Sequence, residues 1–163
     1  MTVASTPIPM PVGAGADPRS YPLIAQLFLL HGYTEVQAAN FDAFVRRTGH
    51  TLLLFTEDPV KYRETLDLAV IVPEIERAFA GRFEVGVLLP EAAREFQPRF
   101  GFRRWPAFVL LRDGRYVGAL DGLRDWSEYI DEVARLLAAP PSRAPTVGIA
   151  VKDAGSAPAA CGS

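Results

Sequence analysis

Residues 103–122, RRWPAFVLLRDGRYVGALDG, decide the fold prediction. An aromatic–proline step, Trp105–Pro106, leads into an apolar run at 107–112 that has the length of a buried strand. The Asp-Gly pair at 113–114 is typical of a two-residue hairpin turn, and a second strand is expected over 115–120. The stretch therefore predicts an antiparallel β-hairpin that the chain enters through a proline.

Helices and strands alternate on both sides of this hairpin. Apolar residues at helical spacing alternate with short apolar runs of strand length, and glycine or proline stands at most boundaries. Pro73 is expected to kink its helix or to restart it. We expect helices over 21–32, 41–48, 68–81, 91–102 (broken near Pro98) and 123–139, and further strands over 33–37, 50–57 and 83–90.

The last predicted helix, 123–139, is clearly amphipathic. Its apolar stripe is expected to face the core, with Trp126 among the buried residues. The stripe consists of Trp126, Ile130, Val133, Leu136 and Leu137.

The order of these elements fixes the fold class. Strand–helix–strand units need a crossover connection, so the strands before the hairpin are expected to be parallel, and the hairpin adds an antiparallel edge. The prediction is an α/β fold with a mixed central sheet and helices on both faces.

Length and composition limit the possible functions. The chain has 163 residues, 49% of them hydrophobic, and a formal net charge of -2. We expect one domain over 21–139, with a flexible lead-in at 1–20 and a flexible tail at 140–163. The chain lacks the excess of basic residues that would indicate a nucleic-acid-binding protein. It also has no secretory signal and no apolar run of the roughly 18–20 residues that a membrane span needs. The sequence thus favours a soluble cytoplasmic protein without membrane insertion.

Cysteine and histidine are scarce. The one cysteine, Cys161, cannot form an internal disulfide, and the two histidines, His31 and His50, belong to no metal-ligand cluster. We therefore expect no cofactor and no metal.

Two stretches resemble the thioredoxin fold. TLLLFTE looks like the central strand that runs into the redox loop, and FGFRRWPAFVLLRDGRYVGALDGLRDWSEYIDEV looks like the C-terminal half. The resemblance implies a cis Trp105–Pro106 bond facing the redox loop. The redox cysteines of that fold would follow Thr56, where this chain has Glu57 and Asp58. Dithiol exchange needs two sulfurs, so thioredoxin chemistry is excluded here.

A narrower resemblance covers residues 21–138. LLLFTEDPVKYRET, RFGFRRWPAFVLLRDGRYVGALDGLRDWSEYI and a leading helix that ends in HGYTEV resemble the HyaE/HupG/HoxO family of hydrogenase expression and maturation proteins, which lack the redox cysteines. The resemblance implies a cytoplasmic, redox-inactive chaperone and not an enzyme. Its expected partner is the precursor of the uptake [NiFe]-hydrogenase small subunit, with its twin-arginine signal peptide, before export. A companion maturation protein is a further expected partner.

The residues themselves suggest where such a peptide binds. Carboxylates beside the former redox loop can pair with arginine guanidinium groups, and the aromatic–proline step can contact an apolar stretch. The alternative is that these acidic residues only complement a helix dipole and face solvent. The hypothetical peptide-binding residues are Glu57, Asp58, Tyr62, Glu64, Asp67, Trp105 and Pro106.

Two other functions stay open at this point. The chain fits a thiol-less thioredoxin-like interaction module for another client protein, and it fits a single-thiol redox protein that uses Cys161. A monomer is expected, because no self-complementary apolar patch stands out in the sequence.

Overall fold

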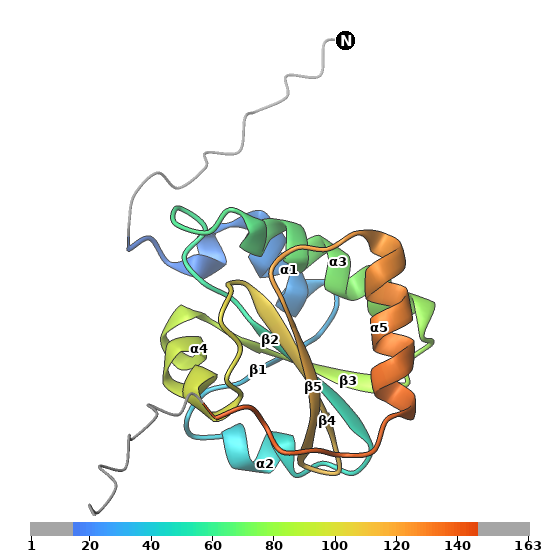
Figure 1. Cartoon of the computed structure of the whole chain (residues 1–163). Coiled ribbons are helices and arrows are strands. Elements are labelled where there is room, and N and C mark those ends of the chain that lie inside the picture. The colour runs from blue at the N-terminus through green and yellow to red at the C-terminus, as the bar shows by residue number, and fades with distance from the viewer. Residues whose placement is uncertain (1–14, 147–163) are drawn as a thin grey trace, which may run out of the picture.

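The computed structural model describes residues 15–146, in which five strands form one sheet between helices (Figure 1). The order of helices and strands is the one predicted. The strands are β1 (Thr34–Glu35), β2 (His50–Phe55), β3 (Phe83–Leu88), β4 (Ala107–Arg112) and β5 (Arg115–Asp121). The α-helices are α1 (Pro22–Leu29), α2 (Phe41–Val45), α3 (Glu64–Ala78), α4 (Pro90–Phe96) and α5 (Trp126–Ala138), with short 3-10 turns at Pro18–Ser20 and Gln97–Arg99.

The sheet has the strand order β1-β3-β2-β4-β5. β3 runs parallel to both β1 and β2, whereas β4 is antiparallel to β2 and to β5. Together with the cis Trp105–Pro106 bond, this confirms the α/β thioredoxin-like fold with a mixed sheet. The predicted hairpin is also confirmed, and Asp113 and Gly114 adopt the positive φ angles, 50° and 78°, that a tight turn of this kind uses.

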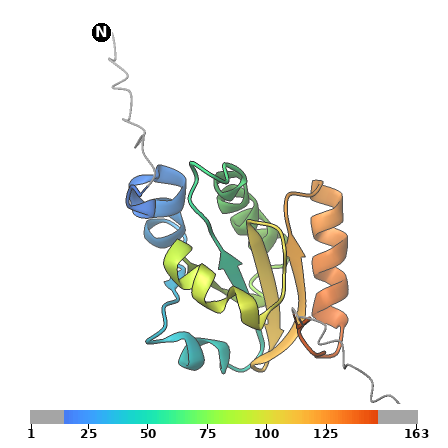
Figure 2. The ribbon, with the colours of Figure 1, turned by 60° about the vertical axis from the view of Figure 1, so that its left-hand side comes forward.

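Each face of the sheet has its own core. α1, α3 and α5 cover one face, and α2 and α4 cover the other, an arrangement that Figure 2 shows from the side. Leu52 and Leu54 of β2 point into the first core, and Leu53 and Phe55 point into the second. Because β2 is buried on both faces, its sequence is a continuous apolar run and not an alternating one.

The prediction for Trp126 was wrong. Trp126 is 49% exposed, whereas Tyr129, one turn later, is buried against Phe108. A capping box between Asp125 and Glu128 starts α5, and the first three residues of the helix, 126–128, are all exposed. The core face of α5 therefore starts at Tyr129, with Val133, Leu136 and Leu137 following as predicted, whereas Ile130 is only half-buried.

Two further expectations concern proline and the chain ends. α3 passes through Pro73 as one continuous helix, without a restart. After α5 the chain crosses the foot of the sheet (Figure 1), where the Ser142 N–H donates to the Tyr116 carbonyl at 2.7 Å. Contacts of the folded unit thus reach beyond the expected boundary at 139. The rest of the expected flexible ends, residues 1–14 and 147–163 with Cys161, lies outside the described residues.

Candidate functional site

The loop at 56–63 joins the carboxyl end of β2 to α3, at the place where related folds carry the redox cysteines. Its start is fixed by buried hydrogen bonds. The N–H and the hydroxyl of Thr56 both donate to the Leu88 carbonyl, at 3.1 and 2.8 Å, and the Glu57 N–H donates to the Thr65 hydroxyl at 3.2 Å. These hydrogen bonds therefore hold the start of the loop in a fixed position between β3 and α3.

Glu57 does not face solvent as the peptide-binding hypothesis requires. It is only 5% exposed, and its carboxylate accepts two hydrogen bonds from the Arg94 guanidinium on α4. The Nε bond measures 2.8 Å, and the hydrogen bonds to Glu57 raise the pKa of Arg94 above its ordinary value. The Asp58 N–H donates to the same carboxylate at 2.8 Å. Glu57 is thus neutralised within the fold and ties the loop to α4.

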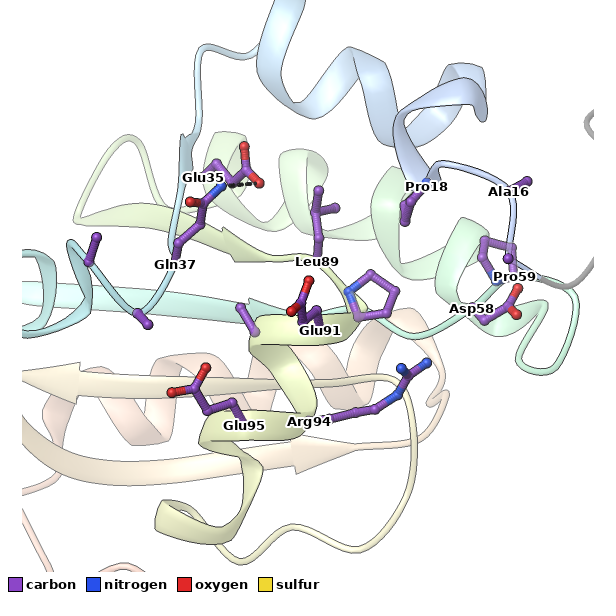
Figure 3. Close-up of a pocket in the computed structure, with 15 residues that line it drawn as sticks. Ala16, Pro18, Glu35, Gln37, Asp58, Pro59, Leu89, Glu91, Arg94 and Glu95 are labelled. Atoms are coloured by element: carbon purple, nitrogen blue, oxygen red, sulfur yellow. Dashed lines mark hydrogen bonds between the residues drawn. The ribbon is translucent and has the colours of Figure 1, made fainter.

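An acidic cleft opens on the α4 side of the loop, with a volume of about 620 Å³. Figure 3 shows Glu91, Arg94 and Glu95 reaching into it from α4, Asp58 from the loop and Glu35 from the end of β1. Its apolar lining comes from Pro18, Ala38, Ala39, Pro59, Leu89, Pro90 and Ala92.

The acidic cleft keeps a negative charge after its internal ion pairs are formed. Glu35 pairs with Arg19, and Arg94 pairs with Glu57. Asp58, Glu91 and Glu95 then have no ion-pair partner among residues 15–146. Three carboxylates beside an apolar wall can attract a cationic group that is joined to an apolar one.

A second cleft, which we call the basic–aromatic cleft, opens on the opposite side of the loop and also measures about 620 Å³. It lies beside the cis proline, and Trp105 is half-buried in it, packed edge-on against Phe102 at 5.1 Å between ring centroids. The lining residues are Lys61, Tyr62, Glu64, Arg103, Arg104, Trp105, Gly122 and Leu123.

The structure therefore divides the residues that the sequence hypothesis placed in one groove. Asp58 belongs to the acidic cleft, whereas Tyr62, Glu64 and Trp105 belong to the basic–aromatic cleft. Pro106 is buried, and Asp67 is exposed on α3 and lines neither cleft.

Sequence reasoning missed Glu91 and Glu95 in the acidic cleft. Their spacing of four residues puts both on one face of a helix, which is a usable signal. What the sequence did not supply was that this face of α4 borders the former redox loop.

Comparison with known proteins identifies the family. The family model described as "Hydrogenase-1 expression protein HyaE" matches residues 23–129. The chain belongs to this family. It is 40% identical to the hydrogenase expression/formation protein HoxO of Cupriavidus necator over 82% of this chain and 84% of the relative.

Other relatives carry similar descriptions. The hydrogenase expression/formation protein HupG of Rhodobacter capsulatus is 30% identical over 80% of this chain and 95% of its own length. A solved structure described as HupG from Rhodopseudomonas palustris is 34% identical, covers 64% of this chain and 95% of its own, and has a TM-score of 0.46.

Residues 15–146 contain neither a candidate membrane span nor a candidate metal site. No helix there is both long enough and apolar enough to cross a membrane. No group of three or more His, Cys, Asp or Glu side chains in the same residues is arranged to hold a metal ion.

Proposed function

We propose that this protein is a non-catalytic chaperone of hydrogenase maturation that binds the precursor of the [NiFe]-hydrogenase small subunit through its twin-arginine signal peptide. Membership of the HyaE family, whose relatives are hydrogenase expression/formation proteins, supports the maturation role. The observation that carries the peptide-binding part is the acidic cleft, with three unpaired carboxylates beside an apolar lining.

The chemistry of the acidic cleft fits a peptide that joins arginine to apolar residues. Arginine presents a planar fork of N–H donors that matches carboxylates, and it loses less hydration energy on binding than lysine does. Asp58, Glu91 and Glu95 are the proposed acceptors, while Leu89 and Pro59 offer apolar contact for the neighbouring residues. The proposed arginine site therefore keeps Asp58 from the sequence hypothesis and adds two residues of α4.

The loop itself supports binding without catalysis. Residues 56–63, TEDPVKYR, contain no thiol, and Glu57 holds Arg94 instead of a substrate. The proposal places the protein in the cytoplasm, as a monomer with one domain whose α-helices and strands lie within 21–139, acting before export of its client. A companion maturation protein is a further proposed partner.

Calorimetry on the full chain tests the proposal. The purified protein is titrated with the small-subunit precursor and with the same subunit lacking its signal peptide. We expect binding that depends on the signal peptide and that the double variant Glu91→Lys/Glu95→Lys abolishes. Asp67→Lys/Asp131→Lys, which makes the same change in charge at exposed sites outside the cleft, is the matched control.

Each other outcome points elsewhere. Equal affinity for both subunit forms would show that the protein binds the mature part of the subunit and not the signal peptide. Wild-type affinity in Glu91→Lys/Glu95→Lys would exclude the acidic cleft. Binding of neither form would leave an interaction module for another client, and a loss of function in Cys161→Ser would revive the single-thiol alternative.

A further inference from the structure

The basic–aromatic cleft differs in charge from the acidic cleft across the same loop. Its lining carries three cations, Lys61, Arg103 and Arg104, and one anion, Glu64. Arg104 lies 3.7 Å from Asp121, and its side chain stays 76% exposed. Lys61 and Arg103 have no ion-pair partner among residues 15–146. A ligand that enters here meets excess positive charge.

Hydrogen bonds hold the backbone of Arg103 and Arg104 in place. The N–H groups of Arg103 and Arg104 both donate to the same carboxylate oxygen of Asp121, at 3.0 and 3.1 Å. The Gly122 N–H donates to the Pro106 carbonyl at 2.9 Å, which fixes the opposite wall. Because the wall is already ordered, binding costs little loss of backbone entropy.

The cleft also offers apolar contact surface. Leu123 is 42% exposed, and the half-buried rings of Tyr62 and Trp105 lie beside it in the lining. The edge-on contact with Phe102 limits the movement of the Trp105 ring, so the indole is a positioned surface. Tryptophan, tyrosine and arginine together are the residue types that most often dominate the binding energy of protein interfaces.

We propose that the basic–aromatic cleft is a second docking site, and that it binds an acidic segment of a partner protein in which carboxylates flank an apolar side chain. Carboxylates of the segment pair with Lys61 and Arg103, and the apolar side chain rests on Trp105 and Leu123. This occupant is opposite in charge to the arginine-bearing peptide proposed for the acidic cleft. Because the two clefts lie on opposite sides of the loop, one chain can bind both segments at once.

A polypeptide suits the cleft better than a nucleic acid does. Glu64 lies in the lining, and the Asp121 carboxylate accepts from the Arg103 N–H, so a phosphate backbone, which is charged at every step, would meet repulsion here. A peptide can instead place its carboxylates at Lys61 and Arg103 and an uncharged residue near Glu64. The whole chain also carries a formal net charge of -2, without the basic excess that is typical of nucleic-acid binding.

Fluorescence of Trp105 reports occupancy directly. The chain has two tryptophans, so in the full-length variant Trp126→Phe all tryptophan emission comes from Trp105. The probe is a short capped peptide that alternates glutamate with leucine and phenylalanine, and its counterpart has lysine in place of every glutamate. We expect saturable quenching or a spectral shift with the acidic peptide and none with the basic one.

Matched charge reversals locate the site. Lys61→Glu/Arg103→Glu in the Trp126→Phe background should weaken the acidic peptide at least about tenfold, because two exposed ion pairs become repulsions. Arg46→Glu/Arg82→Glu makes the same change in charge at exposed positions outside the cleft and should change affinity less than about twofold. Should the first pair lower the unfolding midpoint, Lys61→Gln/Arg103→Gln replaces it, with a loss of about threefold expected.

Three results would overturn the proposal. They are the absence of binding to the acidic peptide, an equal loss of affinity in both charge-reversal pairs, and tighter binding of single-stranded oligothymidylate through the same residues. The probe contains no arginine, so the result is independent of the signal-peptide proposal. Glu91→Lys/Glu95→Lys is accordingly expected to bind the acidic peptide as the wild type does.

Discussion

Replacing Arg94 with alanine should destabilise the protein by stranding a buried charge. Glu57 is 5% exposed and receives two hydrogen bonds from Arg94. Hydrogen bonds to charged groups contribute about 1.5–3 kcal/mol each, and breaking a fully buried ion pair costs about 3–5 kcal/mol. The side chain of Arg94 is 53% exposed, so water can replace part of what is lost. We therefore expect the free energy of unfolding to fall by about 2 kcal/mol, which lowers Tm by about 5–10 °C.

Urea unfolding followed by circular dichroism measures this change, with Arg77→Ala as the control. Arg77 pairs with Glu74 on the exposed face of α3, where both side chains are open to water, 73% and 48% exposed. Its loss should change the free energy of unfolding by no more than about 0.5 kcal/mol.

A double-mutant cycle identifies the cause. In the Glu57→Gln background no buried charge is left behind, so Arg94→Ala should cost at least about 1 kcal/mol less than in the wild type. The reasoning fails if Arg94→Ala matches the Arg77→Ala control, or if its cost is the same in both backgrounds.

Three other predictions concern the core and the response to pH. Gly86→Ala should lower the free energy of unfolding by about 3 kcal/mol in urea titrations, because the new Cβ would lie 2.4 Å from the Phe44 ring and 2.7 Å from Val36. Gly118→Ala, whose new Cβ would also lie 2.4 Å from a side chain but would meet Leu136 alone, should cost less. Tyr129→Phe removes a hydroxyl that donates to the Gly122 carbonyl and accepts from the Arg124 N–H, each at 3.2 Å, and thermal melts should show a loss of about 1 kcal/mol; an unchanged Tm would mean that neither bond contributes. Burial, with the nearby Arg112 and Arg82, lowers the pKa of His50, so the unfolded state takes up the proton first and stability falls as pH drops below about 6.5. His50→Gln should reduce this slope between about pH 7 and pH 5.5, and an unaltered slope would assign it to other groups.

The fold followed from local patterns in the sequence. The Asp-Gly turn and the apolar run of β2 each require little more than their own residues to specify a hairpin and a doubly buried strand. The stripe of α5 was assigned to the core by its period, and Val133, Leu136 and Leu137 do lie there. Ile130 is only half-buried and Trp126 is exposed, because periodicity gives the face of a helix but not which of its turns are covered.

The site was harder to predict because it depends on contacts between distant segments. Glu57 and Arg94 are 37 positions apart, and nothing near either residue indicates that one neutralises the other. The same is true of the two clefts. Acidic and aromatic residues follow one another closely at 57–64, yet the loop turns Asp58 to one side and Tyr62 to the other.

The coupling between cleft carboxylates and peptide arginines tests the central claim most directly. Calorimetry would measure the affinity of the full chain and of Glu91→Gln/Glu95→Gln for the precursor signal peptide and for the same peptide with both arginines changed to glutamine. If the arginines occupy the acidic cleft, the two changes should be non-additive by at least about 1 kcal/mol. Effects that add within about 0.3 kcal/mol would show that the arginines bind elsewhere, and would contradict the proposed function of this cleft.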